Sequence, residues 1–258
     1  MVTPCDVLAV GAHPDDAELG CGATLARLAT AGRRVAILDL TAGELGTRGD
    51  VEVRADEADA AGRALGVSWR HCLGLPDGGL DGGHDGQLAA VVRVVRAAVP
   101  RVVLLPDARD PHPDHAATAA LVRRATFLAG VGKYGAELGA PWRPRLLLAY
   151  PGPRQQLTVD LVVDVTSVYA RKRAALAAHA SQFDPATGGT PTHLASGHFL
   201  AAIEGRDRMA GGSVGVEFGE GFVGCGAIPA DVVAWLFGDA GADCGFPPPD
   251  PAAGGQER

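Results

Sequence analysis

Two short segments of this chain combine histidine with carboxylates, and each comes soon after an apolar run. The first is His13-Pro14-Asp15-Asp16, and the second is His112-Pro113-Asp114-His115. Imidazole and carboxylate groups are the ligands that zinc and other borderline divalent ions prefer in proteins. Two histidines and one carboxylate leave coordination positions open for water and substrate, as a catalytic metal site requires. The two segments together therefore predict a metal site.

The adjacent carboxylates Asp15 and Asp16 cannot both point the same way. One of them can bind a metal while the other faces the metal-bound water. The structural alternative for the first segment is that one aspartate merely caps the following helix. For the second segment, the alternative is a polar helix start with solvated histidines. Because both segments lie in the same local context, the metal site is the better interpretation.

Apolar, strand-like runs alternate with helical patterns over the first 150 residues. This alternation predicts a single Rossmann-like α/β domain, with a mostly parallel sheet flanked by helices on both faces and added edge elements in the C-terminal third. Open sheets of this kind bind ligands at the carboxyl ends of their strands, where both motifs fall. Strands are expected at residues 6–10, 34–40, 69–73, 102–105, 146–150 and 157–165, and helices at residues 18–31, 51–65, 87–98, 116–128, 167–181, 195–209 and 230–236.

Composition restricts the partners and the compartment. The net charge is −7, and no basic patch is visible, which argues against binding to nucleic acid or to an anionic membrane surface. The five cysteines form no Cys-x-x-Cys pair, so we expect neither a disulfide framework nor a thiolate zinc site. No signal peptide and no membrane-length apolar run is apparent, and a cytoplasmic location is expected. The domain is expected to span residues 1–237, followed by a loosely held Gly/Pro/Asp-rich tail at 238–258.

The paired motifs, His13-Pro-Asp-Asp-Ala-Glu-Leu-Gly-Cys-Gly22 and His112-Pro-Asp-His115, resemble the signatures of the PIG-L/LmbE-like superfamily. Its members are metal-dependent de-N-acetylases of N-acetylglucosamine derivatives. Further stretches look most like the bacillithiol-biosynthesis branch, which deacetylates N-acetylglucosaminyl-malate. These stretches are Thr41-Ala-Gly-Glu-Leu-Gly-Thr-Arg-Gly49 with Arg54, Leu73-Gly-Leu-Pro-Asp77, Arg171-Lys-Arg-Ala-Ala-Leu and His179-Ala-Ser-Gln-Phe183.

The resemblance implies a role for each motif residue. His13, Asp16 and His115 would bind Zn²⁺, although Fe²⁺ and Mn²⁺ suit the same ligands. Asp15 would be the general base that takes a proton from the metal-bound water. His112 would stabilise the oxyanion as imidazolium, or protonate the leaving amine, and Asp114 would orient His112 by a hydrogen bond. The branch also implies a small-molecule glycoside as substrate and a homo-oligomer, with a hexamer as one form.

Four charged residues near the same sheet edge are candidates for the substrate-binding rim. Arg54 lies one turn into the helix after the glycine-rich loop and could reach a substrate carboxylate or hydroxyl, such as the malate group. Glu44 and Arg48 lie on that loop, and Arg109 just precedes the second motif. For Arg54 and Arg109, the alternative is a solvated surface arginine.

Other functions would also suit parts of this pattern. Two histidines and a carboxylate also form the facial triad of non-haem iron oxygenases, but those sites usually lie in β-barrels, whereas this chain alternates strand with helix. A deacetylase of another N-acetylglucosamine conjugate is an open alternative: an inositol-linked sugar, a chitooligosaccharide or an antibiotic precursor. A non-catalytic metal- or sugar-binding module is a second open alternative. Dinucleotide binding is rejected, because Leu25 stands where a third glycine belongs after Gly20-Cys-Gly22.

Overall fold

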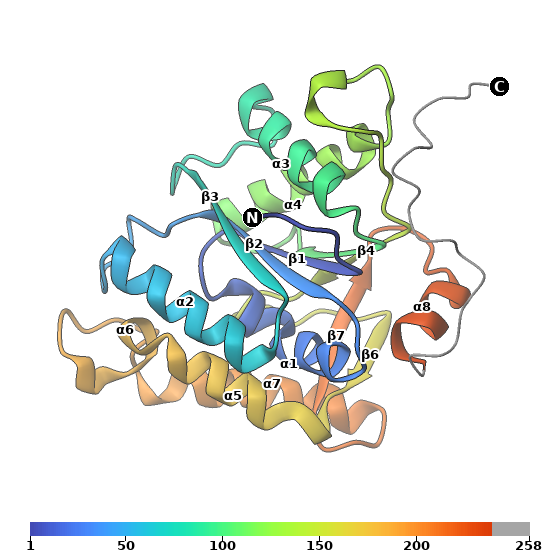
Figure 1. Ribbon diagram of the computed structural model, residues 1–258. Coiled ribbons are helices and arrows are strands. Elements are labelled where there is room, and N and C mark those ends of the chain that lie inside the picture. The colour runs from blue at the N-terminus through green and yellow to red at the C-terminus, as the bar shows by residue number, and fades with distance from the viewer. Residues whose placement is uncertain (239–258) are drawn as a thin grey trace.

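A seven-stranded sheet runs through the middle of the protein (Figure 1), in the computed structural model that describes residues 1–238. The strand order is β3-β2-β1-β4-β5-β7-β6. Strands β1 to β5 pair in parallel, whereas β7 runs antiparallel to both β5 and β6. The bounds are β1 Val7–Gly11, β2 Val35–Thr41, β3 Trp69–Leu75, β4 Val102–Pro106, β5 Leu146–Tyr150, β6 Leu161–Asp164 and β7 Gly219–Gly224.

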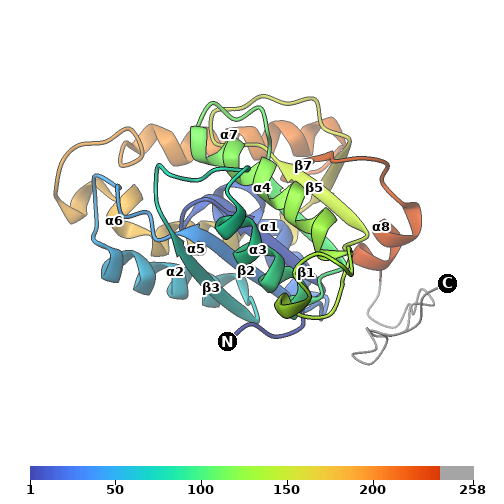
Figure 2. The same cartoon turned by 90° about the horizontal axis from the view of Figure 1, so that it is seen from above.

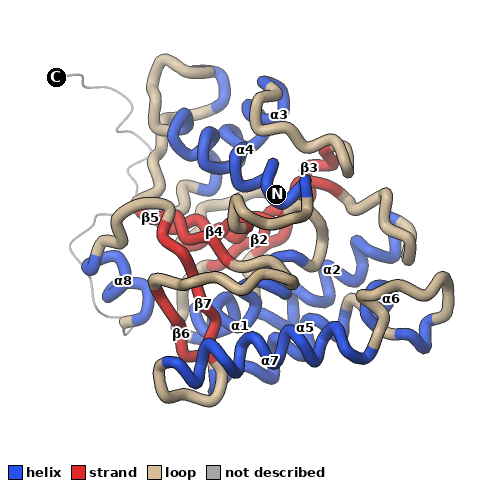
Figure 3. Tube along the Cα trace, turned by 180° about the vertical axis from the view of Figure 1, so that it is seen from behind, coloured by secondary structure: helices blue, strands red, loops and turns tan. Residues whose placement is uncertain are grey.

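Helices cover both faces of the sheet (Figure 2), because alternate side chains of the central strands point to opposite sides. Val7 and Ala9 of β1 pack into the core beneath α1, α2, α5 and α8, whereas Leu8 and Val10 face α3 and α4. Helix α7 runs outside α1 and α5 (Figure 3). The helices are α1 Asp16–Thr30, α2 Val51–Leu65, α3 Asp85–Ala98, α4 Pro113–Ala129, α5 Tyr169–Ala178, α6 Ala180–Phe183, α7 Gly197–Ser213 and α8 Ala230–Phe237, with 3-10 turns at Ala136–Leu138, Thr166–Val168 and Pro185–Thr187.

The predicted architecture is confirmed, and the differences have local causes. Helix α4 begins at Pro113, three residues earlier than expected, because the His112 side chain accepts a hydrogen bond from the Asp114 N–H and caps the helix. The helix expected at 167–181 is interrupted at His179. There the Ser181 N–H donates to Glu57 Oε1 at 2.6 Å and leaves the helical pattern. Apart from Gly238, the expected C-terminal tail lies outside the described residues.

Strand β7 is absent from the sequence prediction, because its sequence Gly-Glu-Gly-Phe-Val-Gly has little strand propensity. Its glycines serve close packing instead. A Cβ on Gly219 would lie 2.6 Å from Val162 Cγ1 and 2.8 Å from the Gly211 nitrogen, so β6 and α7 approach this strand backbone directly. Strand β7 also carries Glu220, which is 1% exposed and reaches into the core.

Glu220 stabilises a break in α1, the helix that follows the first motif. Helix α1 departs from helical geometry at Cys21. The Glu220 carboxylate accepts hydrogen bonds from the N–H groups of Ala23 and Thr24, at 3.1 and 2.7 Å. On the other side of the break, the side chains of Lys172 and Arg206 donate to the Leu19 carbonyl. The free backbone groups of the break are thereby satisfied.

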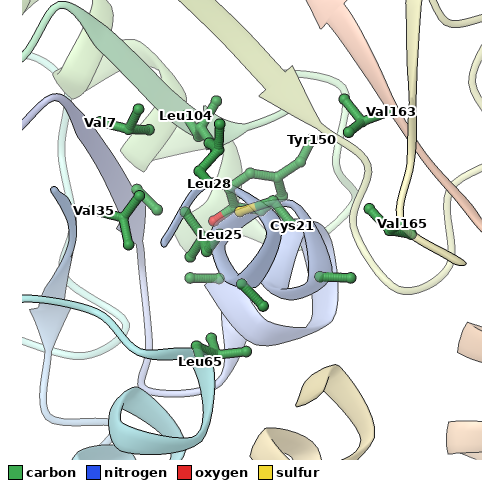
Figure 4. Packing of buried hydrophobic residues seen from close by; sticks show 14 of the residues in the cluster. Val7, Cys21, Leu25, Leu28, Val35, Leu65, Leu104, Tyr150, Val163 and Val165 are labelled. Carbon is green, nitrogen blue, oxygen red and sulfur yellow. The ribbon is translucent and has the colours of Figure 1, made fainter. Parts of the chain in front are cut away.

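Cys21 is a core residue in this structure. Its side chain is fully buried beside Tyr150 in the cluster under α1 (Figure 4). Burial raises the pKa of the Cys21 thiol well above its usual value. The thiol therefore stays protonated and packs as a small apolar group. Within residues 1–238, no helix combines the length and the apolar character needed to cross a membrane.

Candidate metal-dependent active site

The two histidine motifs meet because the strands that precede them are neighbours. Strand β1 pairs in parallel with β4, with Val7 opposite Val102. The chain leads away to β2 on one side and β5 on the other, so this is the switch point at which open α/β sheets form a crevice. The ring centroids of His13 and His115 lie 5.6 Å apart here.

Three side chains at this point offer ligand atoms to a common centre. Asp16 Oδ1 lies 3.1 Å from His115 Nε2, and Asp16 Oδ2 lies 3.5 Å from His13 Nδ1. The candidate ligand atoms of His13, Asp16 and His115 all lie within 4.8 Å of one another. Two imidazoles and a carboxylate in this arrangement fit a zinc-type ion with coordination positions left open. The predicted ligands are thus brought together.

The outer nitrogen of each histidine faces a further carboxylate. His13 Nε2 lies 3.0 Å from Asp77 Oδ1, and His115 Nδ1 lies 2.9 Å from Asp110 Oδ2. Histidines that bind metals usually donate their other ring N–H to a carboxylate, which fixes the ring and its tautomer. This pairing supports the assignment of His13 Nδ1 and His115 Nε2 as the inner, metal-facing atoms.

Asp77 and Asp110 had no predicted role. Asp110 precedes the second motif by two residues, and Asp77 follows β3 in a separate loop. Only a chemical argument could have indicated them. A histidine that binds metal usually has a carboxylate partner, and few Asp or Glu residues follow the strands closely enough to serve. The sequence contains no information on which of them face His13 and His115.

The carboxylates dominate the electrostatics of the two histidines. Burial disfavours a charged imidazole, but Asp16 together with neighbouring carboxylates raises the pKa of His13 to about 9. Asp16 and Asp110 likewise raise the pKa of His115 to about 11. The same contacts hold the pKa of Asp16 well below its usual value despite its burial. The centre is therefore a strongly anionic environment that favours a cation.

Asp15 has an unusual backbone conformation, and its partner differs from those of its neighbour Asp16. Its φ is 135°, in the left-handed region that favours glycine, and its side chain makes no capping hydrogen bond to α1. Asp15 is therefore not a simple helix cap. Its carboxylate lies 3.6 Å from the Arg54 guanidinium, and burial raises its pKa to about 6 although Arg54 opposes the shift.

His112 lines the pocket, and one of its two ring nitrogens is engaged. Its Nδ1 accepts a hydrogen bond from the Asp114 N–H at 3.3 Å, which leaves the proton of a neutral ring on Nε2. Burial and the adjacent His115 and His13 lower its pKa. The resemblance implies either an imidazolium that stabilises the oxyanion or a proton donor to the leaving amine, and this geometry favours a neutral ring with an Nε2–H donor. His13, His112 and Asp114 also lie within ligand range of one another, but this tautomer makes His112 unsuited to bind a cation there.

The Asp114 carboxylate does not accept a hydrogen bond from His112, in contrast to the expectation. Asp114 Oδ2 accepts from the Gly78 N–H at 2.7 Å and lies 3.4 Å from His13 Nε2. The hydrogen bond between these two residues runs from the main-chain N–H of Asp114 to His112 Nδ1. The Asp114 carboxylate thus joins the second motif to the Asp77 loop and helps to hold His13.

The four predicted rim residues have different environments. Arg54 is 4% exposed and donates to the carbonyls of Gly43 and Pro14, so it holds the Asp15 turn. Arg48 lines the pocket, but its guanidinium donates to the loop at residues 181–190. Glu44 accepts from the Asp77 N–H at 2.8 Å and does not line the pocket. Arg109 also lies outside the pocket lining, with a 60% exposed side chain paired to Asp107.

A cavity of about 640 Å³ opens above this centre. Its floor contains the histidines and carboxylates of both motifs, and part of its wall is apolar, with Leu19, Leu194 and Phe199. A cavity of this size can take a small organic molecule, such as a sugar with a substituent. The fold and the site together define an α/β protein with a candidate His/Asp metal centre at the floor of a ligand-sized pocket.

Comparison with known proteins agrees with this class. Residues 8–126 match the PIG-L family, described as GlcNAc-PI de-N-acetylase. One relative is 1D-myo-inositol 2-acetamido-2-deoxy-alpha-D-glucopyranoside deacetylase of Streptomyces avermitilis, 34% identical over 244 residues that cover 69% of this chain and 83% of the relative. Diacetylchitobiose deacetylase of Thermococcus kodakarensis is 32% identical over 189 residues, with 69% and 70% covered.

A solved structure shares the fold over most of its length. A conserved protein from Thermus thermophilus aligns with a TM-score of 0.79 and 36% identity, over 87% of this chain and 96% of that one. The chain therefore belongs to the PIG-L family of de-N-acetylases. The resemblance of the two paired motifs to this superfamily is confirmed.

Proposed function

We propose that this protein is a metal-dependent hydrolase that removes the N-acetyl group from an N-acetylglucosamine conjugate. The observation that carries the proposal is the convergence of His13, Asp16 and His115 beside a separate buried carboxylate, Asp15. Three ligands with an adjacent base suit the attack of water on an amide. Membership of a de-N-acetylase family supports the same reaction.

His13, Asp16 and His115 would hold the ion, with Zn²⁺ as the first candidate and Fe²⁺ or Mn²⁺ as alternatives. Such an ion supplies a water of lowered pKa and polarises the acetyl carbonyl. Asp15 takes a proton from the attacking water. His112 Nε2–H donates a hydrogen bond to the acetyl oxygen, where negative charge develops. The amide C–N bond then breaks as Asp15 passes that proton to the departing nitrogen, which gives acetate and a free amine.

For the substituent on the sugar we propose malate, as the bacillithiol-like stretches around Arg54 and Asp77 suggest. The names of the relatives favour other substituents. The Streptomyces relative is named for an inositol-linked sugar, and the Thermococcus relative for diacetylchitobiose. An inositol conjugate is therefore the second candidate substrate.

The test measures bound metal and turnover together. N-acetylglucosaminyl-malate, N-acetylglucosaminyl-inositol and diacetylchitobiose are offered to the metal-loaded protein, and released acetate is measured. The variant Asp15→Ala should keep its metal and lose turnover by at least about a hundredfold. The variant His115→Ala should lose the metal itself. Turnover by metal-loaded Asp15→Ala would remove Asp15 as the base, and release of acetate from none of the sugars would refute the proposed reaction.

A further inference from the structure

The carboxylates that line the cavity are all engaged at its floor. Asp16 faces the two metal histidines, Asp15 faces Arg54, and Asp77 and Asp110 face the outer nitrogens of the histidines. Asp114 accepts a hydrogen bond from Gly78. Among residues 1–238, the pocket lining therefore presents no unpaired carboxylate toward a substrate.

Unlike the carboxylates, one positively charged residue of the pocket lining has no partner in the part of the chain that the structure describes. Arg154 lines the cavity, is exposed, and makes no hydrogen bond or ion pair with any other residue of the described chain. An arginine with five free donors at a pocket mouth is suited to bind a carboxylate or a phosphate. By contrast, Arg54 is already committed to Asp15 and two carbonyls.

The turn that carries Arg154 is fixed in place. Gly152 packs so closely on the second motif that a Cβ there would lie 1.7 Å from Asp110 Oδ2. The Gly152 N–H donates to Gln155 Oε1 at 2.8 Å, and the Gln155 N–H donates back to the Gly152 carbonyl. Arg206 donates to the carbonyls of Pro151 and Gly152. Arg154 is therefore held at the mouth, directly beside the loop that carries Asp110.

Arg48 adds positive charge on the same pocket wall. Its side chain is buried, and its four donated hydrogen bonds go to the carbonyls of Ser181, Thr190 and Asp184 and to the Thr187 hydroxyl. All four acceptors are neutral, and the guanidinium forms no ion pair within residues 1–238. A buried charge without a counter-ion attracts an anion more strongly than a solvated charge does. Arg48 can therefore favour an anionic ligand through its charge, without direct contact.

We infer that Arg154 is a specificity-determining residue that binds an anionic group, a carboxylate or a phosphate, on the part of the substrate that projects from the sugar toward the pocket mouth. The inference rests on the proposed deacetylation for the identity of the sugar. It rests on the charge distribution of the pocket for the anion. Arg154 thus takes the place of Arg54 and Arg109, the anion-binding residues expected from the sequence. Arg54 is engaged with Asp15, and Arg109 lies outside the pocket lining.

The experiment compares three substrates and two matched variants. The substrates are N-acetylglucosaminyl-malate, N-acetylglucosamine 1-phosphate and the neutral N-acetylglucosaminyl-inositol. In Arg154→Ala we expect kcat/KM to fall roughly ten- to a hundredfold for the anionic substrate that the parent prefers, and less than about twofold for the neutral one. Arg154→Lys should restore part of the loss, because it keeps the charge. Arg109→Ala removes an exposed arginine outside the pocket and should change none of the three values.

The two anionic substrates distinguish a carboxylate from a phosphate as the bound group. The unsubstituted protein should prefer one of them to the inositol conjugate. An equal loss on all three substrates in Arg154→Ala would overturn the inference, as would a parent preference for the neutral sugar. Calorimetric binding to Asp15→Asn, with and without Arg154→Ala, separates binding from turnover. If no sugar is hydrolysed, the proposed reaction fails. A weaker affinity of the double variant for the anionic sugars would then still support the anion site, and equal affinities would overturn it.

Discussion

His13 Nε2 lies 3.0 Å from Asp77 Oδ1, although the two residues are 64 positions apart in the chain. The Asp77 loop is itself tied to the glycine-rich loop after β2, through Glu44 Oε1 to the Asp77 N–H and through Asp77 Oδ2 to the Leu45 N–H. The orientation of a candidate metal ligand thus depends on two loops that follow different strands. His115 has a local equivalent in Asp110, five residues earlier in the chain.

We predict that Asp77→Asn weakens metal binding by roughly ten- to a hundredfold, because the amide no longer fixes the His13 ring as a carboxylate does. Asp110→Asn should have an effect of the same order through His115. Zinc affinity can be measured by competition with a chromophoric chelator. Asp85→Asn, at the exposed start of α3, is the control. An unchanged zinc affinity in both Asp77→Asn and Asp110→Asn would show that these contacts do not orient the ligands.

We predict that metal uptake releases protons. With their pKa raised to about 9 and about 11, His13 and His115 are both protonated at neutral pH before metal binds. An incoming ion must displace one proton from each ring, so apparent affinity rises with pH across roughly pH 6 to 8. Zinc titrations by calorimetry, in buffers that differ in ionisation enthalpy, should report about two protons released per ion near pH 7. Binding independent of pH in this range would contradict the prediction.

We predict that glycine is better tolerated than alanine at position 15. Both substitutions remove the carboxylate and its contact with Arg54, so they differ only in how they accept a φ of 135°. Alanine pays the steric cost of a Cβ in this conformation, about 1–2 kcal/mol, which exceeds the usual entropic disadvantage of glycine. Urea unfolding of the metal-free proteins should therefore show Asp15→Gly to be more stable than Asp15→Ala by about 1 kcal/mol. The opposite order would mean that the backbone relaxes in the alanine variant.

We predict that Lys172→Met destabilises the protein by about 3–5 kcal/mol, because it leaves the carboxylates of Asp207 and Glu220 without their shared cation in the core. It also removes a donor from the Leu19 carbonyl at the break in α1. The free energy of unfolding in urea measures the effect. The neighbouring Arg173→Met, which breaks an exposed ion pair with Glu204, should cost less than about 1 kcal/mol. Similar losses in both variants would argue against a special role for the buried group.

Local sequence was sufficient to predict most of the elements and the place of the two motifs. Strands β1 and β4 are short apolar runs, and the helices after them begin at polar, proline-containing turns, so each motif could be placed from neighbouring residues alone. Parallel strands gather their carboxyl ends on one edge, which predicted that the two motifs would meet. The resemblance of these motifs to the PIG-L/LmbE-like superfamily then implied His13, Asp16 and His115 as the ligands. Strand β7 was missed, because its glycines have little strand propensity and instead allow close packing, as at Gly219 against α7 and β6.

The sequence by itself determined the α/β architecture through its periodicity, and the family and the candidate ligands through the resemblance of its two motifs, because residue type and spacing are local properties. Only the tertiary structure decided which carboxylates face the two histidines and which arginine of the pocket lining makes no hydrogen bond or ion pair within residues 1–238. Asp77 reaches His13 across two loops, Arg54 turns inward to Asp15, and Arg154 is held unpaired at the pocket mouth. These side-chain contacts depend on strand register and on the packing of distant loops. Neither can be predicted from the spacing of residues along the chain.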